Sequence, residues 1–123
     1  MAWGSKSNIL SQSGSSVVSS TEEYTTAVSL NPGEVAHVEV DADNKSASPT
    51  DDLEVKLYAN MTDSSADWDD LPIWSQTVEG VAAAQKLSFV VANLYQFRVG
   101  VAATGGTDNY NVVINYRKDG VSL

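Results

Sequence analysis

Alternation of apolar and polar residues is the main pattern of this chain, and it is most regular over residues 95–117. The apolar positions there are Tyr95, Phe97, Val99 and Val101, then Tyr110, Val112, Ile114 and Tyr116. A period of two places each set on one face of a strand. Gly105 and Gly106 lie between the two sets. Because glycine tolerates the positive φ angles of a tight reversal, the stretch predicts a β-hairpin.

Five further segments repeat the alternation and bring the predicted strands to about seven: residues 24–30, 36–41, 53–60, 73–78 and 87–92. Turn-forming residues separate them, and no segment has the pattern of a helix of normal length. This spacing predicts an all-β fold, either a single antiparallel β-sandwich (immunoglobulin-like or jelly-roll-like) or a closed barrel. Short strands and uneven connections favour the sandwich.

The predicted core consists of the apolar residues on the inward faces of these strands. Its members are Tyr24, Val28, Val38, Val40, Val55, Leu57, Phe89, Val91, Phe97, Val99, Val112 and Ile114. The run Asn31-Pro32-Gly33-Glu34 predicts a turn, since proline presets φ and glycine accepts a left-handed conformation. The strands on either side of it should form a hairpin or a corner between two sheets.

Residues 1–20 differ in composition from the rest of the chain, so residues 21–123 are predicted to form the sandwich domain. The serine-rich run over 11–16 predicts an extended polar N-terminal arm. Trp3, Ile9 and Leu10 are the apolar exceptions in it and are candidate interface residues. We expect Trp3 to dock either on a neighbouring subunit or on its own domain.

Composition narrows the classes of function. Formal net charge is −9, with 16 acidic residues against 7 Lys and Arg, which disfavours nucleic acid and anionic membranes as partners. The chain has no Cys, which excludes a disulfide framework and a thiol nucleophile. Residues 1–6 do not begin a signal peptide pattern, and no apolar run approaches the roughly 20 residues of a membrane helix.

Candidate catalytic and metal-binding residues form no recognisable motif. The run beginning at Asp41 starts like a calcium loop but has Ser46 where glycine is required and no closing glutamate. Acidic residues of the 63–70 loop could bind a hard cation together with Asp51 and Asp52, although solvated carboxylates are the simpler interpretation. His37 is the single histidine and is expected on the polar face of its strand, near Glu39. We therefore predict no enzyme activity, no cofactor and no metal site.

Aromatic residues give a stronger functional signal. Trp68 lies in an Asp-rich loop, and Trp74 begins the next strand. Tyr58 and Tyr95 flank related positions. Exposed aromatic rings on a β-sandwich could stack on a sugar, or they could anchor a protein interface. A third interpretation is that Trp68 and Trp74 cap one end of the core.

Several motifs together resemble small virion proteins of tailed bacteriophages, most closely head decoration (cement) proteins. They are Asn31-Pro32-Gly33-Glu34, Ser48-Pro49-Thr50-Asp51-Asp52, Trp68-Asp69 with Pro72, Ser88-Phe89-Val90-Val91, Phe97-Arg98-Val99-Gly100-Val101, Thr104-Gly105-Gly106-Thr107-Asp108 and Arg117-Lys118-Asp119-Gly120. The resemblance implies a structural protein that is made in the host cytoplasm and reinforces the capsid exterior. It also implies binding to the major capsid protein and self-association on the lattice.

Two alternatives to decoration remain open. One is a carbohydrate-binding or adhesion module that uses Tyr58, Trp68 and Trp74. The other is a neck or tail component of the same virion, present in few copies. The candidate interface residues are Trp3, Ile9, Leu10, Trp68 and Trp74.

Overall fold

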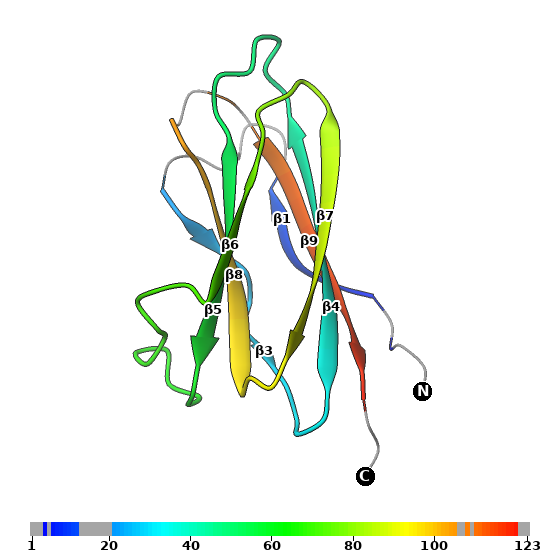
Figure 1. The fold of residues 1–123 in the computed structure, drawn as a ribbon, viewed down its shortest axis with the longest axis vertical. Coiled ribbons are helices and arrows are strands. Elements are labelled where there is room, and N and C mark those ends of the chain that lie inside the picture. The colour runs from blue at the N-terminus through cyan, green and yellow to red at the C-terminus, as the bar shows by residue number, and fades with distance from the viewer. Residues whose placement is uncertain (1–3, 5, 13–20, 106–107, 109, 121–123) are drawn as a thin grey trace.

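Two antiparallel sheets pack face to face in the computed structural model, which describes residues 4, 6–12, 21–105, 108 and 110–120 (Figure 1). The strands are β1 (Ser7–Gln12), β2 (Glu23–Tyr24), β3 (Val28–Ser29), β4 (Val35–Asn44), β5 (Leu53–Asn60), β6 (Trp74–Val78), β7 (Ala84–Ala92), β8 (Gln96–Ala103) and β9 (Tyr110–Asp119). Sheet A has the order β1-β9-β4-β7, and sheet B has the order β2-β8-β5-β6, with β3 also paired to β8. The predicted all-β antiparallel sandwich is confirmed.

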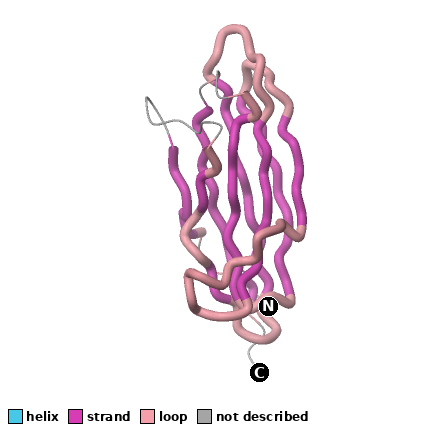
Figure 2. Tube along the Cα trace, turned by 90° about the vertical axis from the view of Figure 1, so that its left-hand side faces the viewer, coloured by secondary structure: helices cyan, strands magenta, loops and turns pink. Residues whose placement is uncertain are grey.

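The long strands run along the length of the molecule, and the connecting loops gather at its two ends (Figure 2). The described residues contain nine strands rather than about seven. One difference is the splitting of the predicted 24–30 strand into β2 and β3, and the other is the additional strand β1. None of the described residues forms a helix that could span a membrane.

The predicted hairpin over 95–117 is wrong, because β8 and β9 belong to different sheets. β8 pairs with β2, β3 and β5, whereas β9 pairs with β1 and β4. The two apolar faces were correctly identified, since Phe97 and Ile114 are both fully buried. They face each other across the core instead of lying side by side. Alternation reveals which side chains point inward, but it does not reveal which sheet a strand joins.

The connection between β3 and β4 is a corner between the two sheets, which is one of the two arrangements expected from the sequence. β3 lies in sheet B and β4 in sheet A. Gly33 has a φ of 85°, which L-residues rarely adopt, and Glu34 N–H donates to the Asn31 carbonyl at 3.0 Å. The turn predicted at residues 31–34 is therefore confirmed.

The core lies between the sheets and contains nearly all the predicted residues. Ten of the twelve are buried, and Phe89 is partly buried against them. Tyr24 is the error: it is 42% exposed, while Thr25 beside it is buried. Thr25 N–H donates a hydrogen bond to the Val99 carbonyl, and the Thr25 hydroxyl accepts one from Val99 N–H. The alternation of buried and exposed residues restarts at Val28. This break between β2 and β3 turns Tyr24 outward.

The predicted N-terminal arm is partly incorporated into the sandwich. Ser7–Gln12 forms β1, an edge strand paired with β9, and Ile9 C=O accepts a hydrogen bond from Thr26 N–H at 3.2 Å. A register shift between Asn8 and Leu10 marks a β-bulge. Ile9 and Leu10 are partly buried against the core, and this packing favours the pairing of the segment with β9. The rest of the predicted arm lies outside the described residues, apart from Gly4 and Lys6.

Candidate functional site

Five side chains gather on the outer face of sheet B, and we call them the aromatic platform: Glu22, Tyr24, Tyr58, Trp68 and Arg98. The strand register explains the grouping, because Tyr58 pairs with Arg98 and Tyr24 pairs with Gly100. Side chains two apart on one strand share a face, so Arg98 and the Gly100 position both point away from the core. Gly100 leaves room for the Glu22 carboxylate, since a Cβ there would lie 2.8 Å from Glu22 Oε2.

Arg98 is the centre of the platform. Its guanidinium carbon lies 3.7 Å from the ring centroid of Tyr24 and 4.4 Å from that of Trp68. Both distances are well inside the range of cation–π attraction. Arg98 Nε is buried without a hydrogen-bond partner, and no carboxylate of the described residues lies within 4.0 Å of the guanidinium nitrogens. Its positive charge is therefore held by aromatic rings rather than by an ion pair.

Glu22 holds the two tyrosine rings in place. Tyr24 OH donates to Glu22 Oε1 at 2.7 Å, and Tyr58 OH donates to Oε1 and Oε2 at 2.9 and 3.1 Å. The rings of Tyr24 and Tyr58 meet edge to face, with centroids 5.7 Å apart. The pKa of Tyr24 is raised mainly by its hydrogen bond to Glu22 and secondly by burial. The pKa of Tyr58 is raised mainly by burial and secondly by its own hydrogen bond to Glu22. Both phenols therefore keep their protons.

Trp68 reaches the platform because the 61–73 loop is fixed by hydrogen bonds to the end of β5. Trp68 forms an isolated bridge with Asn60, and Asp69 N–H donates to the Ala59 carbonyl at 3.0 Å. Asn60 Nδ2 also donates to the Ser64 carbonyl at 2.8 Å. The sequence predicted only an irregular segment here, yet these contacts place the indole ring over Arg98.

Trp74, the other described candidate tryptophan, lies away from the platform. It is partly buried on β6, and its ring centroid lies 4.6 Å from that of Phe89 on β7. These are edge strands of the two sheets, so the pair closes one side of the sandwich. Ile9 and Leu10 pack against their own core, and Trp3 lies outside the described residues. The use of these residues in an interface stays a prediction.

A second polar cluster joins the loops at the opposite end of β5. Asp108 is buried, and its Oδ2 accepts hydrogen bonds from the main-chain N–H groups of Thr50 at 2.7 Å and Asp51 at 2.9 Å. It also accepts from Asn44 Nδ2 at 2.8 Å. These hydrogen bonds lower the pKa of Asp108 to about 2, and the bond from Asn44 has the largest effect. Burial acts in the opposite direction but is outweighed. The carboxylate is therefore ionised and fully occupied by donors of the chain.

Asp51 completes this cluster in the reverse direction. Its Oδ2 accepts from Asp108 N–H at 2.8 Å, and its carbonyl accepts from Tyr110 OH at 2.9 Å. The two aspartates thus tie the β4–β5 loop to the β8–β9 connection. We call Asn44, Thr50, Asp51, Asp108 and Tyr110 the loop junction.

The acidic cation site considered from sequence is not assembled. Asp51 and Asp52 precede β5 and the 63–70 loop follows it, so this eight-residue strand separates them by roughly 25 Å. Within the loop, Asp63 accepts from Tyr95 OH at 2.9 Å and Asp67 accepts from Thr62 Oγ1 at 2.8 Å. No group of three or more metal-binding side chains occurs among the described residues.

His37 lies on the outer face of sheet A, as the alternation predicted. It is exposed and directly opposite Arg117 of β9, and Glu39 of the same strand is opposite Asn115. This face is on the other side of the sandwich from the aromatic platform.

Comparison with known proteins adds little to this geometry. No protein-family model matches the chain, and no curated protein matches its sequence. A solved structure described as "CBM4 structure and function" is similar at 14% sequence identity and a TM-score of 0.45, over 89% of this chain and 73% of that one.

Proposed function

We propose that this chain is a non-catalytic carbohydrate-binding module whose ligand lies on the aromatic platform. The observation that carries the proposal is the Arg98 guanidinium stacked on Tyr24 and Trp68 without an ion pair among the described residues. Buried charges are normally paired, so a partly buried arginine with unfilled donors favours a ligand that supplies acceptors.

The chemistry of the platform suits a sugar. A pyranose ring presents C–H groups on its faces, which pack against aromatic rings, and hydroxyl groups at its edge, which hydrogen-bond. Tyr24 is 42% exposed and supplies an accessible ring. Arg98 supplies N–H donors in a fixed plane next to that ring. Sites for small ligands usually combine a largely apolar surface with a small number of polar groups.

Preorganisation supports the same function. Glu22 fixes both tyrosine rings through three hydrogen-bond contacts, and the main-chain bonds of the 61–73 loop fix Trp68. A site that is already ordered loses less conformational entropy when the ligand binds.

The experiment is calorimetric titration with a panel of soluble β-glucan, xylan and mannan oligosaccharides. We expect one class to bind, and Trp68→Ala and Tyr24→Ala each to weaken binding at least about tenfold, which corresponds to about 1.4 kcal/mol. Tyr95→Ala is the matched control, because Tyr95 is a 49% exposed tyrosine outside the platform. Absence of binding to a broad glycan panel, or equal losses in the Tyr24 and Tyr95 variants, would refute the proposal.

We propose a second candidate function, decoration of a phage capsid, which the exposed apolar side chains of the β5–β6 loop support. Met61, Leu71 and Ile73 are 85%, 78% and 53% exposed. Figure 1 shows this loop projecting from the side of sheet B. Exposed apolar side chains grouped on one surface are typical of protein interaction sites. The partners in this proposal are the major capsid protein and further copies of the chain, on the virion exterior.

Quantitative mass spectrometry of gradient-purified particles tests this second function. Copy numbers comparable to the major capsid protein are expected for a decoration protein, whereas a few copies would indicate a neck or tail component. Leu71→Ser with Ile73→Ser should lower particle occupancy and leave oligosaccharide binding intact. Absence from particles would exclude both virion roles.

A further inference from the structure

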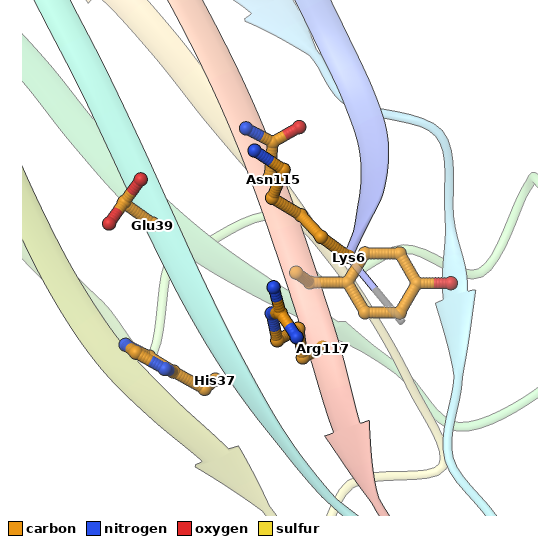
Figure 3. A pocket seen from close by; sticks show the side chains of 6 residues that line it. Lys6, His37, Glu39, Asn115 and Arg117 are labelled. Carbon is orange, nitrogen blue, oxygen red and sulfur yellow. The ribbon is translucent and has the colours of Figure 1, made fainter. Parts of the chain in front are cut away.

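A hollow on the outer face of sheet A gathers basic side chains in an otherwise acidic protein. It has a volume of about 250 Å³ and is lined by Lys6, His37, Glu39, Asn115, Tyr116 and Arg117. Figure 3 shows side chains from β4, from β9 and from the segment before β1 grouped around it. It lies on the opposite side of the sandwich from the aromatic platform.

The register of β4 and β9 builds two sides of the hollow. His37 pairs with Arg117, and Glu39 pairs with Asn115. Since side chains two apart on a strand share a face, these four form one patch that points away from the core. Asn115 Oδ1 accepts from Asn8 Nδ2 at 3.1 Å, so the Asn115 amide N–H groups remain as donors.

The third side is the N-terminal segment, which is held against β9. Gly4 N–H donates to the Lys118 carbonyl at 2.6 Å, and Ser7 is in register with Tyr116. Arg117 Nη1 makes a long contact of 3.5 Å with the Gly4 carbonyl. Lys6 lies between these attachment points, which explains why its side chain lines the hollow.

The local charge of the hollow is opposite to that of the whole chain. Among the described residues that line the hollow, Lys6 and Arg117 are positive and Glu39 alone is acidic, whereas the formal net charge of the chain is −9. Three lysines form ion pairs elsewhere: Lys45, Lys56 and Lys118. Among the described residues, no carboxylate lies within 4.0 Å of the charged nitrogens of Lys6 or Arg117. At physiological salt, the acidic residues more than about 8 Å away are largely screened.

We propose that this hollow binds a small oxyanion, a carboxylate, sulfate or phosphate group. Arg117 offers a planar fork of donors that matches two oxygens, and Lys6 of the N-terminal segment adds a point charge beside it. The Asn115 amide supplies a neutral donor. The site is independent of the aromatic platform and of sugar binding.

The test is a titration of the full chain with sodium phosphate, sodium sulfate and sodium acetate, followed by two-dimensional amide NMR. Sodium chloride keeps the ionic strength constant. We expect saturable shifts centred on Lys6, His37 and Arg117, and Arg117→Gln should weaken binding at least about tenfold. Lys86→Gln is the matched control, since Lys86 is exposed on β7 and its loss changes the charge equally.

The outcomes separate the ligand classes and the competing explanation. Saturation by acetate alone identifies a carboxylate ligand, and saturation by sulfate or phosphate identifies a tetrahedral one. Shifts that never saturate, that chloride reproduces, or that Arg117→Gln and Lys86→Gln alter equally would overturn the proposal. Oligosaccharide binding by Arg117→Gln should equal that of the parent chain, so failure here does not affect the proposed sugar site.

Discussion

The loop junction and the aromatic platform both gather polar side chains from distant parts of the chain. They differ in whether the hydrogen-bonding groups of those side chains have partners within the protein. In the junction, Asp108 is buried and accepts four hydrogen bonds from Asn44, Thr50 and Asp51. In the platform, Arg98 is stacked on aromatic rings and its Nε has no hydrogen-bond partner among the described residues. A satisfied buried network stabilises one conformation, whereas unfilled donors beside exposed rings are suited to a ligand.

The largest expected loss of stability follows from Asp108→Ala. The substitution leaves the Thr50 and Asp51 main-chain N–H groups and the Asn44 amide without their acceptor. Chemical denaturation should show a lower midpoint for this variant than for Trp74→Ala, Trp68→Ala or Tyr58→Phe. Asp70→Ala is the control, since Asp70 is exposed on the 61–73 loop. Equal midpoints for the two variants would mean that the junction contributes no stability.

Acid should weaken the same junction. The pKa of Asp108 is lowered from 3.8 to about 2 in the folded chain. The contribution of this carboxylate to stability is therefore complete at pH values above 3.8, the pKa of the group in the unfolded chain. Stability should then fall as pH drops from about 4 towards 2, because the unfolded state binds the proton more readily. Denaturation midpoints across this range measure the effect. Asp108→Asn should reduce the slope, and an unchanged slope would assign the acid sensitivity to other carboxyl groups.

The two described candidate tryptophans provide a direct contrast between packing and binding. Trp74→Ala removes the contact with Phe89 and should cost about 2–3 kcal/mol of unfolding free energy, somewhat less than a fully buried aromatic residue. Oligosaccharide affinity should stay within twofold. Trp68→Ala should show the converse, with lost affinity and a small change in stability. Matching behaviour of the two variants in both assays would remove the distinction between core and platform.

The smallest expected effect is that of Tyr58→Phe. This change removes one donor to Glu22 but keeps the ring beside Tyr24, so we expect a loss of about 1–2 kcal/mol in unfolding free energy. Affinity should fall only modestly, because Tyr24 still donates to Glu22. A loss of affinity as large as that of Trp68→Ala would mean that Tyr58 itself touches the ligand.

Candidate site residues were only partly predictable. Tyr58 and Trp68 stood out as aromatic residues near a loop, whereas Tyr24 was assigned to the core. Arg98 appeared as one polar position of an alternating strand, and Lys6 as part of a polar arm. Nothing in their spacing indicates that Arg98 meets Trp68, thirty positions away in the chain, or that Lys6 lies beside Arg117.

The sequence alone determined which side chains are buried over most of the chain. Alternation of period two depends only on local strand geometry, so Val38, Val55, Val99 and Ile114 could be assigned to the core without knowing their neighbours. The turn at Gly33 was predictable for the same reason, since it depends on the conformational freedom of one residue.

Tertiary structure decided which strand pairs with which, and therefore where the sites lie. A strand with one apolar face satisfies its pattern equally well beside a neighbour or across the core from it, so β8 and β9 could not be assigned to sheets from sequence. The outer faces follow from that assignment. Tyr24, Tyr58 and Arg98 meet because β2, β5 and β8 share sheet B. Lys6, His37 and Arg117 meet because β4 and β9 are neighbours in sheet A and the segment before β1 lies along β9. Such contacts depend on pairing between distant segments, which no local pattern encodes.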